Sequence, residues 1–147
     1  MRSSIAPSSL SDYLAQVALR PEVRPRIFER TRRIVNANFS LFADWIRHHD
    51  PGFRLVPPRA GAIAYPRYSW PINSTRLMER LRDEQSLLVV PGDQFGMDGF
   101  LRIGLGNEPE DLKAGLLRMD SVLESLGPAP GFEGSGGSEP GGRRPGR

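Results

Sequence analysis

The chain of 147 residues contains no cysteine. This absence excludes disulfide bonds, thiolate metal ligands and cysteine nucleophiles. No apolar run approaches the roughly 20 residues that a membrane-spanning helix needs, so we expect no membrane partner. The first residues, MRSSIAPSSLSDYL, also lack the continuous apolar core of a secretory signal. A cytoplasmic location is therefore predicted.

Lysine is nearly missing, because Lys113 is the only one among 20 basic residues and the others are arginines. The net charge of +3 raises the hypothesis of a nucleic-acid-binding protein. Over most of the chain, however, the arginines are interleaved with Asp and Glu, which is typical of solvated helix faces. We therefore expect no nucleic-acid partner. The nucleic-acid hypothesis rests only on the basic composition and on the arginines near the end of the sequence.

Two helices are predicted in the first third of the chain. Residues 8–20 open with a Ser-x-x-Asp capping pattern, Ser9 and Asp12, and continue as an apolar stripe. A longer helix follows over about 23–48. One face of it is expected to be buried, since its stripe recurs at a spacing of three or four residues. The stripe consists of Ile27, Thr31, Ile34, Asn38, Leu41 and Trp45.

After residue 48 the pattern changes to short strands alternating with helices. Strands are predicted at 53–56, 61–67 and 86–90 and in the stretch FLRIGL, with GDQFGMDG as a loop. A third helix begins at Asn73 or Ser74, and a last one is capped by Asn107 with Glu110. The predicted fold class is α+β: long N-terminal helices lead into a small antiparallel or mixed sheet that has helices packed on one face.

Three segments are expected. Residues 1–22 form an N-terminal helical segment, and residues 23–126 form the small α+β domain. Residues 127–147 contain so much glycine and proline that they cannot bury enough surface to become ordered, and we predict a disordered tail.

The stretch GFLRIGLG, residues 99–106, places a permanently charged group inside a nearly apolar segment. In a strand alternate residues share a face, so Arg102 is expected on the face opposite to Leu101 and Ile103. Gly104 would leave space beside it for a planar carboxylate. Two interpretations are open: a structural ion pair with a carboxylate of this chain or of a missing domain, which geometry alone favours, or a binding site for a carboxylate.

Four segments in this order resemble the C-terminal small domain of class I/II aminotransferases, which are fold type I enzymes that use pyridoxal phosphate. The resemblance covers about residues 5–126. The segments are RPRIFERTRRIVNANFSLFADWI, PPRAGAIAYPR, LRDEQSLLVVPGDQFGMDGFLRIGLG and PEDLKAGLLRMDSVL.

The resemblance implies roles for a few residues. Arg102 matches the family's arginine that pairs with the substrate α-carboxylate, and Gly92, Phe95 and Gly96 match its loop beside the substrate pocket. Phe95 and Gly96 are thus possible pocket walls, although Phe95 could equally be a core residue. The implied substrates are an amino acid and a 2-oxo acid, and the implied partners are the family's large domain and a second subunit of a homodimer.

The sequence departs from the family in one large respect. The Schiff-base lysine, the phosphate cradle and the residues around the cofactor ring belong to the large domain, which the resemblance does not cover. Lys113 is expected to be solvated and is not assigned to the cofactor. We therefore expect no catalytic residue in this chain and no binding of pyridoxal phosphate by the chain alone.

The leading hypothesis is that the chain is the C-terminal part of an aminotransferase. It could be a truncated gene product, a sequence with a misplaced start codon or one half of a split enzyme. The alternative is a non-catalytic interaction module that pairs with a separate large domain or a homologue. Two other features carry no function. His48-His49-Asp50 is expected to be a polar helix end without a metal, and Asp93 and Asp98 are expected to be solvated loop carboxylates.

Overall fold

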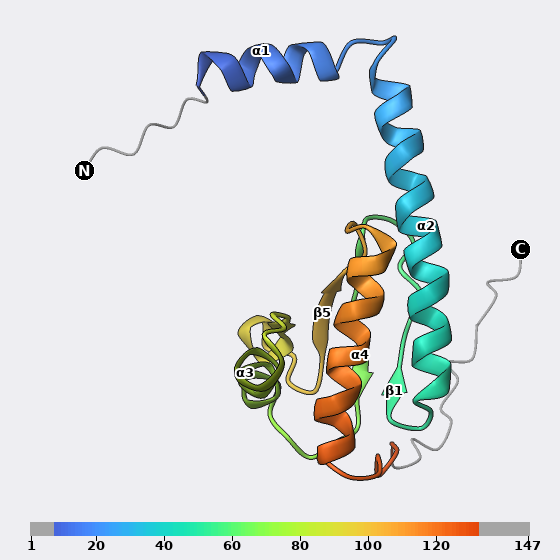
Figure 1. The fold of residues 1–147 in the computed structure, drawn as a ribbon, viewed down its shortest axis with the longest axis vertical. Coiled ribbons are helices and arrows are strands. Elements are labelled where there is room, and N and C mark those ends of the chain that lie inside the picture. Colours follow the sequence, from blue (N-terminus) through green and yellow to red (C-terminus); the bar gives the residue numbers. More distant parts are fainter. Residues whose placement is uncertain (1–7, 133–147) are drawn as a thin grey trace, which may run out of the picture.

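The protein is described by a computed structural model over residues 8–132 (Figure 1). Helix α1 spans Ser9–Ala18, and Ser8 caps it by accepting from the backbone N–H of Ser11. The cap is therefore Ser8 and not the predicted Ser9. None of the residues of α1 is buried, and the apolar side chains of its stripe, among them Leu10 and Leu14, are exposed.

Helix α2 spans Arg24–His48, close to the predicted bounds. Its buried residues, Asn38, Phe42 and Ile46, follow each other at four-residue spacing in the second half of the helix. The stripe predicted from Ile27 onward is therefore buried only in part, because Ile27 is 42% exposed. Figure 1 shows α1 and the first half of α2 extending beyond the other elements.

Within residues 8–132, five short strands form two small antiparallel sheets. Strand β1, Phe53–Arg54, pairs with β3, Arg67–Tyr68. The other sheet has the order β2-β5-β4, made of Ile63–Ala64, Leu101–Gly104 and Val90–Pro91.

The single strand predicted at 61–67 was wrong, because it divides into β2 and β3, which pair with different partners. Pro66 lies between the two and has no backbone N–H to give to a ladder. Of the strand predicted at 86–90, only Val90 lies in a strand. Ser86 ends the preceding helix in a left-handed conformation, so the chain cannot enter a regular strand there.

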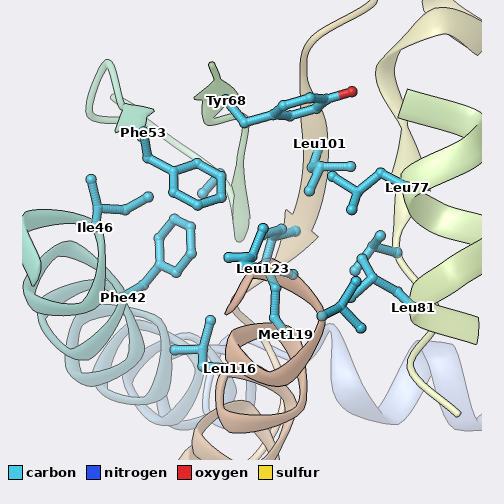
Figure 2. Packing of buried hydrophobic residues seen from close by; sticks show 14 of the residues in the cluster. Phe42, Ile46, Phe53, Tyr68, Leu77, Leu81, Leu101, Leu116, Met119 and Leu123 are labelled. Atoms are coloured by element: carbon cyan, nitrogen blue, oxygen red, sulfur yellow. The ribbon is translucent and has the colours of Figure 1, made fainter. Parts of the chain in front are cut away.

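Helices α3, Ser74–Gln85, and α4, Pro109–Ser125, complete the fold. The core lies between these helices, α2 and the strands (Figure 2), where Phe42, Leu77 and Leu101 are completely buried. The predicted α+β class, with helices over a small sheet, is confirmed. The predicted Asn107 cap is wrong, since Glu108 occupies the N-cap position of α4 without a side-chain capping bond.

The segment after α4 lies against the domain as far as the structure describes it. Trp70 Nε1 donates to the carbonyl oxygen of Gly127 at 3.0 Å. The guanidinium carbons of Arg54 and Arg67 lie 4.6 and 5.1 Å from the centre of the Phe132 ring. Residues 127–132 of the predicted tail therefore contact the domain, and residues 133–147 lie outside the described range. Within residues 8–132 no helix is long and apolar enough to cross a membrane.

Candidate functional site

Arg102 lies in β5 with its side chain exposed, between the buried Leu101 and Ile103. This is the placement predicted from strand alternation. Within residues 8–132 its guanidinium forms no ion pair, whereas Arg30, Arg76 and Arg80 each pair with a glutamate. The described part of the chain thus contains no partner for a structural ion pair between Arg102 and another residue of residues 8–132.

The surroundings of Arg102 leave room for a ligand. The register pairs Ile63 with Gly104 and Ala64 with Ile103, so Tyr65, the residue after β2, continues this register toward Arg102, while Val90 of β4 pairs with Arg102 on the other side. No atom lies within 4 Å of the position that a Cβ on Gly104 would take. A hollow of about 130 Å³ lies between β5, residues 87–89 and the side of α4 that runs from Asp111 to Met119, and Arg102 and Gly104 are among its lining residues. Asp111 also lines it without pairing with Arg102.

The glycine-rich loop forms a short 3₁₀ helix, η1, over Gly92–Phe95, where a plain loop was predicted. Gly96 ends it with a φ of +70°, a conformation that favours glycine. Phe95 is 58% exposed, so the interpretation of Phe95 as a core residue is wrong. The pocket-wall role of Phe95 and Gly96 stays a prediction.

Gly92 is the point where this loop packs most closely. A Cβ there would contact the carbonyl oxygen of Met97 and would lie 2.8 Å from that of Phe100. Gly92 also donates its N–H to Phe100 O at 2.9 Å, which joins the loop to β5. The absence of a side chain at residue 92 therefore sets the distance between the loop and the strand that carries Arg102.

We expect Gly92→Ala to destabilise the domain by roughly 1–3 kcal/mol, because backbone atoms cannot move aside cheaply. Gly104→Ala is the matched control, since open space surrounds that position. Urea unfolding of both variants measures the difference. Equal stability of the two variants would contradict the close approach at Gly92.

Asp93 and Asp98 are not simply solvated, contrary to the prediction. Asp98 Oδ1 accepts from the backbone N–H of Ser74 at 2.7 Å, at the start of α3. Asp93 Oδ1 accepts from the hydroxyl of Thr75 at 2.9 Å. Asn73 Oδ1 accepts from the N–H groups of Thr75 and Arg76. The loop is thereby attached to the N-terminus of α3, which favours negative charge.

These contacts lower the pKa of both carboxyl groups. The Thr75 hydroxyl is the main cause for Asp93, and the Ser74 backbone N–H is the main cause for Asp98. A carboxyl group with a lowered pKa in the folded state stabilises that state above its unfolded pKa. This stabilisation is lost as the pH falls through the folded value.

We therefore expect wild type to have a higher free energy of unfolding than Asp98→Asn at pH 6. This difference should shrink once the pH falls below the ordinary aspartate pKa of 3.8. Asparagine keeps an acceptor oxygen but carries no charge at any pH. Urea midpoints measured from pH 6 to pH 3 test this expectation. A gap that is independent of pH would show that the charge of Asp98 does not matter.

The remaining candidates lie elsewhere. His49 Nε2 is 3.2 Å from Asp120 Oδ1, which also accepts from Trp45 Nε1 at 2.7 Å. The histidine thus belongs to a polar link between α2 and α4. Lys113 is exposed on α4, and its Nζ is paired with Glu110 at 3.1 Å.

Two residues near the site were missed by sequence reasoning. Tyr65 could have been found only from the strand register. Asn38 is completely buried and donates to the carbonyl oxygens of Leu105 and Asn107, just beyond β5. A polar residue in the middle of an apolar stripe was the available signal for Asn38.

Comparisons with known proteins agree on one family. The family model of aminotransferase class I and II matches residues 1–118. Aromatic-amino-acid aminotransferase 2 of Thermococcus litoralis is 29% identical over 127 residues, which are 84% of this chain and 32% of that protein. Capreomycidine synthase of Streptomyces vinaceus is also 29% identical over 127 residues, covering 84% of this chain and 31% of that protein.

The structural comparison gives the same result. A PLP-dependent aminotransferase from Streptococcus suis superposes with a TM-score of 0.74 at 27% identity, covering 80% of this chain and 31% of that one. The chain thus spans about a third of the length of these relatives. With the family model matching most of the chain and the fold in agreement, the chain belongs to the class I and II aminotransferase family.

Proposed function

We propose that the chain is the C-terminal small domain of a pyridoxal-phosphate-dependent aminotransferase and that Arg102 binds the α-carboxylate of its substrate. The observation that supports this role is an exposed arginine on the open face of β5 that has no ion pair within residues 8–132. A guanidinium offers two parallel N–H donors that match the two oxygens of a carboxylate. The empty space at Gly104 leaves room for such a group.

The test compares an amino acid with an amine that lacks the carboxylate, on an Arg102→Lys variant. It requires the rest of the enzyme, supplied in one chain or as a second chain. Loss confined to the amino acid supports the proposal, and equal loss for both substrates contradicts it.

The proposed reaction is the exchange of an amino group between an amino acid and a 2-oxo acid. Several relatives support this reaction by name, among them the aromatic-amino-acid aminotransferase and the probable aspartate/prephenate aminotransferase of Aquifex aeolicus. Capreomycidine synthase is named as a synthase, so amino transfer is the better supported but not the sole reaction in this group of relatives.

The described residues do not fit the cofactor by themselves. Pyridoxal phosphate is attached through a lysine amine in this family, and the sequence has only Lys113. Its amine is engaged with Glu110 on an exposed helix face. We infer that the lysine and the phosphate site come from outside this chain, which would then be inactive alone.

We expect no stoichiometric pyridoxyl adduct on Lys113 when the chain is mixed with a low concentration of pyridoxal phosphate and reduced with borohydride. Peptide mass spectrometry after digestion locates any adduct. Lys113→Arg is the matched control for non-specific labelling of the N-terminal amine. Stoichiometric labelling of Lys113 at low cofactor concentration would contradict the inference.

A second candidate is an interaction module or split-enzyme subunit that pairs with a separate large domain. The exposed apolar side chains of the two protruding helical segments favour it, since such surface is normally covered by a partner. These include Leu10, Tyr13, Leu14, Ile27 and Phe28, each at least 42% exposed. Activity recovered by mixing this chain with a separately expressed large domain would support the split enzyme.

A further inference from the structure

Two arginines face each other where the sheet ends near the last described residues. Arg54 of β1 and Arg67 of β3 are direct partners in an antiparallel pair. Directly opposed residues in such a pair point to the same face, and like charges there repel each other. Both side chains are exposed, so water screens much of this repulsion, and the negative charge of a bound anion would remove the rest.

The described part of the chain does not supply that charge. Neither Arg54 nor Arg67 forms an ion pair within residues 8–132, although Arg47, Arg76 and Arg82 do. Both guanidinium groups instead lie over the ring of Phe132, at 4.6 and 5.1 Å from its centre. A ring face attracts cations but carries no net charge, so it orients the two groups without neutralising them.

A hollow of about 400 Å³ adjoins this pair and is lined by Arg54, Arg67, Ser69, Asp98 and Gly99 together with Gly131 and Phe132. The Ser69 hydroxyl oxygen is buried and has no hydrogen-bond partner in residues 8–132. Asp98 brings one negative charge, but its Oδ1 is already occupied by the N–H groups of Ser74 and Gly99. Arg54 and Arg67 carry two positive charges and Asp98 carries one negative charge, so the lining of the hollow is positively charged overall.

We propose that Arg54 and Arg67 form a binding site for a phosphate group. A phosphate monoester carries close to two negative charges at neutral pH, which matches two guanidinium groups, and its three terminal oxygens can accept from both forks. Ser69 also lines the hollow, although its hydroxyl oxygen is buried, so the two guanidinium groups are the donors that reach a ligand there. The residues that line the hollow at Arg102 are entirely different, so this site is separate from the proposed substrate site.

Amide NMR titrations of the full chain with inorganic phosphate and with glycerol phosphate, at constant ionic strength, test the proposal. We expect saturable shifts at Ser69, Gly99 and Gly131. Tighter binding of glycerol phosphate would identify an organic phosphate as the ligand, and tighter binding of inorganic phosphate would identify free phosphate. Equal binding would show that the site recognises the phosphate group alone. Chloride and succinate serve as the other anions. A response to succinate as strong as that to phosphate would overturn the assignment to phosphate.

Variants locate the site. Arg67→Gln should weaken phosphate binding at least about 10-fold, since a hydrogen bond to a charged group is worth about 1.5 kcal/mol or more. Arg67→Lys should weaken phosphate binding less, because lysine keeps the positive charge but loses the paired N–H donors of the guanidinium group. Arg59→Gln is the matched control: Arg59 is exposed, forms no ion pair within residues 8–132 and lines another hollow.

Circular dichroism establishes that each variant is folded. If Arg67→Gln is not folded, Arg54→Gln and Arg67→Lys decide the question in its place. Unchanged affinity in the folded variants, or shifts that do not saturate, would overturn the proposal. Failure here would leave the Arg102 proposal untouched, because that test measures turnover and not phosphate binding.

Discussion

An Arg102→Lys variant of the enzyme completed with its large domain is expected to lose about 10- to 150-fold in kcat/KM for amino-acid substrates. Lysine keeps the positive charge but replaces two parallel hydrogen bonds with a single point contact. A hydrogen bond to a charged group contributes roughly 1.5–3 kcal/mol, which corresponds to that range of rates. Amines without a carboxylate never use the contact, so their turnover should change little.

The melting temperature separates this role from a structural one. Arg102 is exposed and has no ion pair within residues 8–132, so its replacement should leave stability unchanged. Arg118→Lys is the matched control, because Arg118 is an exposed arginine on α4 that also lacks an ion pair in the described range. If amine and amino acid lose activity in equal proportion, Arg102 is part of the scaffold and the carboxylate assignment is wrong.

Asn38→Leu is expected to lower the free energy of unfolding by about 1–3 kcal/mol, or roughly 5–10 °C in melting temperature. The Asn38 amide donates to Leu105 O at 3.0 Å and to Asn107 O at 2.7 Å. Leucine has a similar volume but no donor, so the buried carbonyl of Leu105 would lose its partner, whereas the carbonyl of the exposed Asn107 can bind water instead. A buried acceptor without a partner carries a desolvation penalty of about 1–3 kcal/mol.

Asn36→Leu is the control for this substitution. Asn36 lies on the same helix but is exposed, and its side chain forms no hydrogen bond within residues 8–132. Thermal unfolding of the two variants should therefore differ clearly. Similar melting temperatures would mean that the link between α2 and the end of β5 contributes little to stability.

Much of the fold could be predicted because its signals are local. The bounds of α2 follow from a run of residues with helical spacing that ends at the Asp-Pro-Gly of residues 50–52. The exposure of Arg102 follows from the two-residue period of a strand, which needs no knowledge of the partner strand. The family resemblance also depends on segments that are each continuous in sequence.

Contacts between distant residues could not be predicted in this way. The division of 61–67 between two sheets depends on which strands lie beside Ala64 and Arg67, and Pro66 alone does not specify them. Asp93 and Asp98 looked like solvated loop carboxylates because their partners lie 18 and 24 residues away, at the start of α3. The length of α2 that is buried could not be predicted from the sequence either, since it depends on where the other elements end.

By itself, the sequence determined the class of fold, the order of its helices, the family and the face of the strand on which Arg102 lies. Each depends on periodicity or on a continuous motif, which short stretches of chain express independently. Only the tertiary structure decided that Arg102 has no ion pair within residues 8–132, that Asn38 joins α2 to the end of β5, and that Arg54 lies opposite Arg67. These facts concern residues brought together across the chain, because packing and strand register, rather than local pattern, choose the neighbours of a side chain.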